Sequence, residues 1–304
     1  MDNTLSIVIP TIGRNALEQT IHSVLTQTRL PDEIIVWDNS GTGAARQHSA
    51  YAEHPAIRWQ ISECKLPIIE SWNTAVGFCR SKFLYILGDD DLLLPEFVET
   101  VKEELSKGAR LIHVEAIPID ENGNILEMPE TAETPSCMSA EAFFAAFAVT
   151  ARYKIQLGAL VFSRQDFEAV GKFKDLIMNA LAMDILFNME LLSAVGKITV
   201  LPRPLWQYRT AVADWSGSLK SPADIPLLMR QYLQYRDFAR PLFRGNLQKM
   251  WPEFNRRLVF CQMTKLCYKT SPWKTLMSAS TVPMALKERL YILRDWLYLL
   301  RHGA

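Results

Sequence analysis

Residues 83–95 read FLYILGDDDLLLP. An apolar run of strand length ends here in three successive carboxylates, Asp89, Asp90 and Asp91. Crowded carboxylates repel one another, so the triplet needs a compensating positive charge. Mg²⁺ and Mn²⁺ supply such a charge and prefer oxygen ligands. Because ligands of open α/β sheets bind beyond the carboxyl ends of the strands, the triplet predicts a metal site. The alternative is a solvated turn and helix cap before Pro95.

Strand and helix patterns alternate on both sides of this stretch. Short apolar runs predict strands at 6–10, 33–37, 57–61, 83–87 and 111–114. Periodic apolar residues predict helices at 15–27 and 69–79, and a third helix from Pro95 to Gly108. This order predicts a doubly wound, mostly parallel α/β sheet. After residue 115 the pattern changes: Asn122-Gly123 predicts a hairpin, and residues 181–192 predict a helix.

Composition suits a globular chain with one large or two modest domains: 304 residues, 49% of them hydrophobic. Residues 220–304 carry 15 Lys and Arg against 5 Asp and Glu, which leaves a net charge of −10 on residues 1–219 because the total is zero. The five cysteines form no CxxC pair, which argues against a disulfide framework or a zinc site. No signal peptide is visible, and no apolar run approaches the ~20 residues of a spanning helix. We expect a cytoplasmic protein, with peripheral contact to the inner face of the cell membrane left open.

Polar clusters close three of the predicted strands, at residues 11–14, 38–40 and 89–91. In a parallel sheet these three strand ends lie along one edge. One such cluster is ordinary turn chemistry, but three together favour a cleft for a nucleotide and a metal. The chain has no GxGxxG after its first strand and no GxxxxGK[ST], which disfavours a dinucleotide-binding fold and a P-loop. A metal would then hold the diphosphate, which indicates a nucleotide-diphosphate donor.

The order of these motifs resembles family 2 glycosyltransferases of GT-A fold, of the bacterial surface-polysaccharide type. The matching segments are 6–11, 23–28, 33–40, 70–75 and 85–91, and a weaker resemblance continues from Asp184 to Arg209. The resemblance implies that residues 1–115 form the nucleotide-sugar-binding half of a GT-A domain and residues 116–219 its acceptor-binding half. Residues 220–304 would be a basic helical C-terminal region.

The resemblance also implies a nucleobase pocket lined by Pro10, Thr11 and Asp38. The Asp38 carboxylate would accept a hydrogen bond from a base N–H, and the alternative is a turn-forming Asx residue. Arg14 would belong to the same nucleotide-sugar site.

Two further polar residues are candidates for the donor site. Asn73 would lie near the nucleotide sugar, or else be a polar residue on a helix surface. Lys65 would meet the diphosphate, or else be a solvated lysine.

Within the acidic triplet the family motif is usually Asp-x-Asp-Asp, and Gly88 here takes the place of its first aspartate. Counted back from Pro95, Asp90 matches the metal ligand. Asp89 then falls beside the ribose, and Asp91 is a second metal ligand or a capping carboxylate. The literal Asp-x-Asp spacing pairs Asp89 with Asp91 and leaves that other assignment open.

An inverting transfer needs one carboxylate to take a proton from the acceptor hydroxyl. The resemblance implies Asp184 as this general base, with Met183 replacing a preceding acid. Apolar neighbours would raise the pKa of Asp184 by desolvation. The alternative is a helix cap or a surface aspartate. Relatives often carry a histidine after the segment matching Tyr208-Arg209; here either Asp214 or water would complete the metal shell.

The basic C-terminal region has two open interpretations: contact with an anionic membrane surface, or simple packing as a helical cap. Nucleic-acid binding is not expected, because no recognised motif supports it. The sequence therefore predicts an inverting glycosyltransferase that uses Mn²⁺ or Mg²⁺ and a UDP-sugar, with a thymidine-diphosphate sugar as the alternative donor. The acceptor would be a bacterial cell-surface glycan, free or lipid-linked. The rival functions are a sugar-nucleotide nucleotidyltransferase and a non-catalytic nucleotide- or sugar-binding member of the fold.

Overall fold

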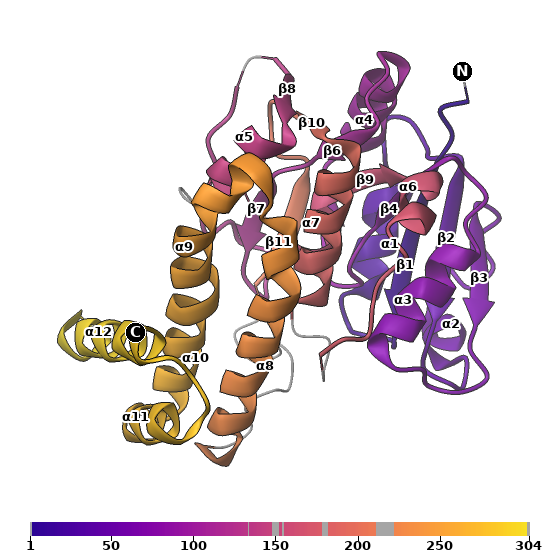
Figure 1. The fold of residues 1–304 in the computed structure, drawn as a ribbon. Coiled ribbons are helices and arrows are strands. Elements are labelled where there is room, and N and C mark those ends of the chain that lie inside the picture. Colours follow the sequence, from indigo (N-terminus) through magenta and orange to yellow (C-terminus); the bar gives the residue numbers. More distant parts are fainter. Residues whose placement is uncertain are drawn as a thin grey trace. The chain divides into compact units, whose positions relative to one another are not determined.

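The structure, a computed structural model, describes residues 2–132, 134–147, 152–153, 155–177, 182–210 and 222–302. The chain forms two compact units (Figure 1). Unit 1 comprises Met1–Phe143, Tyr153–Asp175 and Phe187–Ala211, and unit 2 comprises Phe144–Arg152, Leu176–Leu186 and Val212–Ala304. Residues 116–219, taken together in the sequence, thus contribute to both units.

A single large sheet organises unit 1. Its strands lie in the order β3 (Ile57–Ile61), β2 (Glu33–Asp38), β1 (Leu5–Thr11), β4 (Phe83–Ile86), β9 (Leu160–Ser163), β6 (Leu111–His113), β10 (Lys197–Val200) and β8 (Ser136–Ser139). The pairs β3–β2, β2–β1, β1–β4 and β6–β10 are parallel. Strand β9 pairs antiparallel with β4 and β6, and β8 pairs antiparallel with β10. The predicted mostly parallel α/β sheet is confirmed.

Strand β1 is central and has almost no exposed surface. Ile7, Val8 and Ile9 are fully buried, as expected for a parallel strand that is covered on both faces. Its register pairs Thr11 with Asp38 at the end of β2. On the other side, the backbone N–H of Leu87 donates to the carbonyl of Val8 at 3.0 Å. The three polar strand ends therefore lie along one edge, as the alternating pattern predicts.

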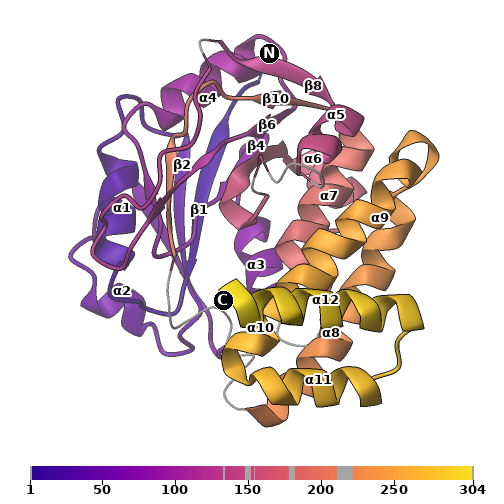
Figure 2. The ribbon, with the colours of Figure 1, turned by 90° about the vertical axis from the view of Figure 1, so that its left-hand side faces the viewer.

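Helices cover both faces of the parallel half of the sheet (Figure 2). Helices α1 (Leu17–Leu25) and α4 (Phe97–Ser106) share one core cluster with alternate residues of β1 and β4. Helix α3 (Ile68–Gly77) packs against β1 and β2. The remaining short helices here are α2 (Ala44–His48) and α6 (Arg164–Ala169).

A second, smaller sheet lies next to the acidic triplet in the chain. Its order is β5 (Leu92–Leu93), β11 (Trp206–Arg209) and β7 (Ala116–Ile119), with β11 parallel to β7 and antiparallel to β5. The predicted hairpin at Asn122-Gly123 is confirmed by an antiparallel bridge between Ile119 and Ile125. Strand β11 thereby comes beside β5, which directly follows Asp91.

Helix α5 (Ala140–Ala145) and helix α7 (Met183–Val195) each contribute residues to both units. The described residues of unit 2 from Pro222 onward are mostly helical, in agreement with the predicted C-terminal helices. Its longer elements are α8 (Ile225–Ala239), α9 (Trp251–Phe254), a π-helical segment (Asn255–Cys261), α10 (Gln262–Thr270), α11 (Pro272–Thr281) and α12 (Leu286–His302). Aromatic residues fill its core; the rings of Phe243 and Phe254 lie 4.6 Å apart. Within the described part of the chain, no helix combines the length and the apolar character that crossing a membrane requires.

Candidate functional site

The acidic triplet begins where β4 ends, and its first member turns toward β1. Thr11 Oγ1 donates a hydrogen bond of 2.6 Å to Asp89 Oδ2, and both residues are buried. The same hydroxyl oxygen accepts the backbone N–H of Gly13 at 2.9 Å. Gly13 has a φ of 87°, a conformation that side-chain-bearing residues rarely adopt, and it turns the chain over the strand ends. Thr11 thus joins the end of β1 to the triplet.

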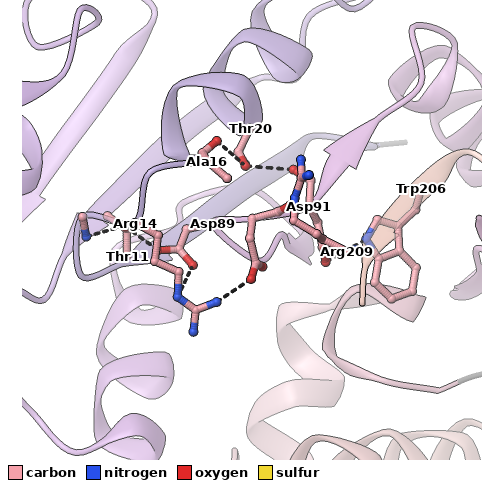
Figure 3. Close-up of polar contacts among 10 residues, drawn as sticks. Thr11, Arg14, Ala16, Thr20, Asp89, Asp91, Trp206 and Arg209 are labelled. Atoms are coloured by element: carbon pink, nitrogen blue, oxygen red, sulfur yellow. Dashed lines mark hydrogen bonds and ion pairs between the residues drawn. The ribbon is translucent and has the colours of Figure 1, made fainter. Parts of the chain in front are cut away.

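Arg14 supplies a positive charge to the first two carboxylates. Figure 3 shows Arg14 beside Asp89. Its Nη1 lies 2.5 Å from Asp90 Oδ2, and its Nε lies 3.6 Å from Asp89 Oδ1. The Asp90 side chain keeps 23% of its surface exposed, against 9% for Asp89. Asp90 is therefore the member of the triplet that a solvent-borne cation reaches most directly.

Asp91 turns the other way, toward the small sheet. Its Oδ2 accepts the indole N–H of Trp206 at 3.0 Å, and its Oδ1 accepts the backbone N–H of Arg209 at 2.9 Å. Its carbonyl accepts the hydroxyl of Thr20 on α1 at 2.8 Å. The carboxylate thus holds β11 in place, and these contacts favour a positioning role for Asp91.

Arg209 binds the backbone of both the triplet and the hairpin that follows β7. Its Nε donates to the carbonyl of Asp90 at 2.8 Å, and its Nη1 donates to the carbonyls of Asp120 and Glu121 at 3.1 and 2.7 Å. Its Nη2 donates to Gln19 Oε1 at 3.1 Å. The guanidinium therefore fixes the turn that carries Asp90 against the hairpin and α1.

The triplet holds more negative charge than its surroundings favour. Burial raises the pKa of Asp91 to about 8, with a further contribution from the Asp90 charge. Burial also raises the pKa of Asp89, although Arg14 and the Thr11 hydroxyl act against that shift. An added cation would favour the ionised carboxylates, because opposite charge stabilises the charged form.

Asp38 ends β2 and is completely buried. Its Oδ1 accepts the backbone N–H of Ser40 at 2.9 Å, and its Oδ2 accepts that of Arg46 at 3.0 Å. These are the contacts of the predicted Asx alternative. Each carboxylate oxygen can accept a second hydrogen bond, so recognition of a base N–H stays a prediction. Pro10, half-buried, lies beside Trp37 in the same register.

The loop that carries Lys65 is anchored to the end of β2. Asn39 Nδ2 donates to the carbonyl of Leu66 at 3.0 Å, and Asn39 Oδ1 accepts the Leu66 N–H at 2.9 Å. Gly41 allows this approach, because a Cβ there would lie 2.6 Å from the backbone nitrogen of Lys65. Lys65 is exposed. Its predicted contact with a diphosphate is untested.

The side chain of Asn73 on α3 is hydrogen-bonded to the backbone of the loop after α6. Its Nδ2 donates to the carbonyl of Phe173 at 2.9 Å, and its Oδ1 accepts the Phe173 N–H at 3.1 Å. This amide pair holds two segments that are 100 positions apart. Proximity of Asn73 to a nucleotide sugar stays a prediction.

Asp184, the predicted general base, lies in the first turn of α7 and within unit 2. Its Oδ1 accepts the backbone N–H of Ile185 at 2.9 Å. Its charge adds to the effect of burial in raising the pKa of Tyr235 on α8. Ala182, just before it, has a φ of 55°, a strained conformation of the kind that persists where surrounding structure enforces it. Asp214 and Trp215 lie outside the described residues.

The residues at the triplet fit a divalent cation of the kind bound jointly by protein and substrate. Mg²⁺ is usually held by one or two carboxylates together with substrate phosphates. Among the described residues, no group of three or more His, Cys, Asp and Glu side chains could hold a metal on its own. Asp90 offers a partly exposed carboxylate, and the Arg14 guanidinium beside it shows that the cluster attracts a cation.

Comparison with known proteins identifies the family. The sequence profile of the family described as "Glycosyl transferase family 2" matches residues 6–165, more than half of the chain. The chain belongs to glycosyl transferase family 2. The triplet, Thr11 and Asp38 all fall within the matched segment.

The chain is also similar to individual known proteins. Escherichia coli chondroitin synthase is 31% identical over 127 residues, which are 40% of this chain and 18% of that enzyme, so the match spans about a fifth of the relative. The crystal structure of S. aureus TarS 1–349 superposes with a TM-score of 0.65 at 14% identity, covering 99% of this chain and 92% of that one. The TarS complex with UDP-GlcNAc gives a TM-score of 0.61 at 13% identity. These structures confirm the GT-A-like fold.

The structure brings some of the predicted site residues together and adds others. Thr11, Arg14, Asp89 and Asp90 form one contact network. Asn39, Trp206 and Arg209 were not predicted as site residues. Asn39 stands in a predicted polar cluster, which is a usable signal, whereas nothing local to Trp206 or Arg209 indicates a partnership with the triplet.

Proposed function

We propose that this protein is a metal-dependent, inverting hexosyltransferase that uses a UDP-sugar. The observation that carries the proposal is the Thr11–Asp89 and Arg14–Asp90 network at the strand ends of a family 2 chain. It places a hydroxyl, a cation and two carboxylates at the edge where open α/β sheets bind ligands.

UDP-GlcNAc is the first donor to test. The similar TarS structure was determined in complex with UDP-GlcNAc, and another with UDP. The site supports a donor with a diphosphate, because Arg14 can pair with phosphate oxygens and Lys65 stands on a loop anchored beside Asp38. Pro10, Thr11 and Asp38 would contact the nucleobase.

The sugar half of the donor would lie next to the triplet. Asp89, fixed by Thr11, would face the ribose, and Asn73 would border the nucleotide sugar. Asp90 would hold Mn²⁺ or Mg²⁺, with Asp91 as a further candidate ligand. A bound divalent ion would offset negative charge on the leaving diphosphate.

Asp184 would act as the general base of a single displacement. Its carboxylate would take the proton of the acceptor hydroxyl as that oxygen forms a bond to the anomeric carbon. The bond from the anomeric carbon to the diphosphate oxygen would break at the same time, and UDP would leave with the electron pair. Attack on the face opposite the leaving group inverts the anomeric configuration.

The proposed acceptor is a bacterial cell-surface glycan, either free or carried on a lipid, and the proposed location is the cytoplasm, at the inner face of the cell membrane. Chondroitin synthase, the relative with 31% identity, has a name that refers to a polysaccharide product. That name supports a glycan as the acceptor but does not identify which glycan.

Thermal-shift titration tests the donor directly. The 304-residue protein is titrated with UDP-GlcNAc, other UDP-sugars and a thymidine-diphosphate sugar, each with Mn²⁺ and with EDTA. We expect the melting temperature to rise with a UDP-sugar and Mn²⁺ together, and to rise less with EDTA. Product analysis of the best donor with glycan acceptors should then detect UDP release.

Two outcomes would select the rival functions. Release of pyrophosphate from a nucleoside triphosphate and a sugar phosphate would indicate a nucleotidyltransferase. Tight donor binding without UDP release, with water or any glycan tried, would indicate a non-catalytic member of the family.

A further inference from the structure

Helix α12 of unit 2 carries a row of leucines that faces solvent. The members of this outer row are Leu286, Leu290, Leu293, Leu297 and Leu300, with exposed fractions between 41% and 74%. Their alternating spacing of four and three residues keeps them on one side of an α-helix. At 1.5 Å per residue the outer row is about 21 Å long.

Another side of α12 already has its packing partners. Ile292, Trp296 and Leu299 are buried, and the Trp296 indole donates to the carbonyl of Pro272 on α11 at 2.8 Å. Helices α11 and α12 lie side by side in unit 2 (Figure 2). The helix thus has two apolar stripes, and its inner stripe suffices to hold it in the unit. The outer row needs a different explanation.

A row of cations runs beside the outer row. Lys287, Arg294 and Arg301 are exposed and recur every seven residues, so they lie along one flank of the leucines. Arg289 lies on the other flank. Arg294 also pairs with Asp295 at 2.5 Å, and both of its neighbours in the row are basic.

The acidic residues of α12 point away from the outer row. Glu288 accepts Arg236 Nη1 of α8 at 2.5 Å, and Asp295 accepts Arg294. Counted around the helix, both lie on the side opposite the leucines, so the row's own neighbours are cations.

This charge pattern disfavours a second copy of the chain as the occupant. A coiled coil through the outer row would place the flanking positions of the two helices opposite each other. Arg289 would then meet Arg294 of the second copy in a parallel pair, and like residues would meet in an antiparallel pair. Either arrangement sets cation against cation, which is unfavourable.

An anionic lipid surface satisfies both rows at once. Amphipathic helices lie in a membrane interface with their apolar side among the acyl chains and basic residues at the headgroups. Trp273 of α11 is 72% exposed, and its ring lies 5.7 Å from that of Trp296, on the Arg289 flank of the row. Tryptophan favours the membrane–water boundary. We infer that the outer row of α12, with its flanking cations and Trp273, docks on an anionic membrane surface. This inference stands independently of the proposed donor and acceptor.

Co-sedimentation of the full 304-residue chain with vesicles tests the inference. Vesicles of phosphatidylcholine alone are compared with vesicles that contain phosphatidylglycerol. We expect the parental chain to bind the anionic vesicles, with at least ~10-fold weaker binding after charge reversal at Lys287, Arg294 and Arg301. The triple change Leu290→Ser, Leu293→Ser and Leu297→Ser should weaken binding by a similar factor.

Matched controls separate the surface from general effects. The apolar control is Ile125→Ser, Leu126→Ser and Met128→Ser, which removes three residues exposed by 51%, 58% and 60% elsewhere. The charge control reverses Arg29, Arg80 and Lys197, three exposed cations of unit 1. Both controls should bind vesicles as the parental chain does, and circular dichroism should show that every variant is folded.

Three results would overturn the inference. The first is equal recovery of the parental chain with neutral and anionic vesicles. The second is parental vesicle binding by the leucine variant. The third is a concentration-dependent dimer, seen by light scattering and lost in the leucine variant, without vesicle binding; that result would assign the outer row to a second copy of the chain.

Discussion

The indole N–H of Trp206 donates a 3.0 Å hydrogen bond to Asp91 Oδ2, across 115 positions of the chain. Together with the Arg209 backbone N–H on Oδ1, it leaves each oxygen of this buried carboxylate with a donor from β11. Asp90, the preceding residue, faces Arg14 and solvent instead. Adjacent aspartates therefore have different surroundings, and their substitution should have different consequences.

Trp206→Phe should destabilise the protein while leaving its folded shape intact. The substitution keeps an aromatic ring in the core but removes the donor to a buried carboxylate, which costs about 1–3 kcal/mol. Urea denaturation followed by circular dichroism measures this loss. Trp273→Phe, at a position 72% exposed, is the matched control and should leave the unfolding free energy unchanged. Equal stability of Trp206→Phe and the parental chain would contradict the assigned role of the hydrogen bond.

Asp90→Ala should abolish the Mn²⁺-dependent part of UDP binding with little effect on stability. The carboxylate is partly exposed, and its main side-chain partner, Arg14, is exposed more than it is. Calorimetric titration with UDP, with and without Mn²⁺, measures the difference. Glu53→Ala removes another exposed carboxylate paired with an arginine and should bind as the parental chain does. Retained Mn²⁺ dependence in Asp90→Ala would move the metal to another carboxylate.

Arg14→Ala should bind Mn²⁺ alone several-fold more tightly and bind UDP less tightly. The guanidinium neutralises Asp89 and Asp90, so it competes with a cation, whereas it would attract a diphosphate. Electron paramagnetic resonance of free Mn²⁺ reports the first effect, and UDP titration in EDTA reports the second. Arg14→Lys keeps the charge, so its affinities for Mn²⁺ and for UDP should lie between those of the parental chain and those of Arg14→Ala. A parallel loss of both affinities would show that Arg14 supports the fold of the site instead.

Glu33 should make the fold sensitive to acid. Burial alone would raise the pKa of its carboxyl, but hydrogen bonds from Ser6, the Arg80 and Ser81 backbone and Arg58 outweigh burial, so the pKa lies below its usual value of 4.5. A group whose pKa is lowered by folding stabilises the protein above the unfolded pKa and loses that contribution as the pH falls.

Glu33→Gln should therefore cost about 1–3 kcal/mol of unfolding free energy at pH 7. The difference from the parental chain should shrink as the pH falls below 4.5, because the Glu33 carboxylate then takes up a proton first in the unfolded chain and, at lower pH, in the folded protein. Urea denaturation across pH 3 to 8 measures this effect. Glu53→Gln, at an exposed ion pair, provides the control. A difference that is constant over the whole range would exclude ionisation of Glu33 as its cause.

Asp184→Asn should reduce sugar transfer by about 10²–10⁴-fold while leaving UDP-sugar binding unchanged, because it removes a proton acceptor and keeps the shape. Sugar transfer is measured as the release of UDP. Donor binding is measured as the shift in melting temperature. Asp237→Asn on α8, with an exposed side chain, is the control in the same unit. Parental transfer by Asp184→Asn would exclude it as the base.

Local sequence patterns were sufficient to predict which residues lie at the edge of the sheet. The apolar runs before Thr11, Asp38 and Asp89 identify strands, because a parallel strand is buried on both faces and admits few polar residues. Their polar ends follow from the same rule, since the edge of the sheet is where the chain meets water. Parallel pairing then brings the three strand ends to one edge, and the structure adds the register that sets Thr11 opposite Asp38.

Long-range partners could not be derived in this way. Arg14 meets Asp90 across 76 positions, and Asn73 meets Phe173 across 100. Such contacts depend on how loops of different lengths fold over the sheet. A hydrogen-bonding side chain also has many chemically equivalent partners elsewhere in the chain, so its sequence position does not identify the one it binds. The different roles of Asp90 and Asp91 follow from how these loops fold.

Helix α12 shows the same division between local pattern and packing. Its sequence, by its periodicity and charge, specifies a basic amphipathic helix. The periodicity contains two apolar stripes, and either could pack inward. Only the packing of α12 against α10, α11 and the π-helical segment decided that Ile292, Trp296 and Leu299 are covered, while the outer leucine row faces solvent. Burial depends on which neighbouring surface is complementary in shape, and that surface is assembled from residues distant in the chain.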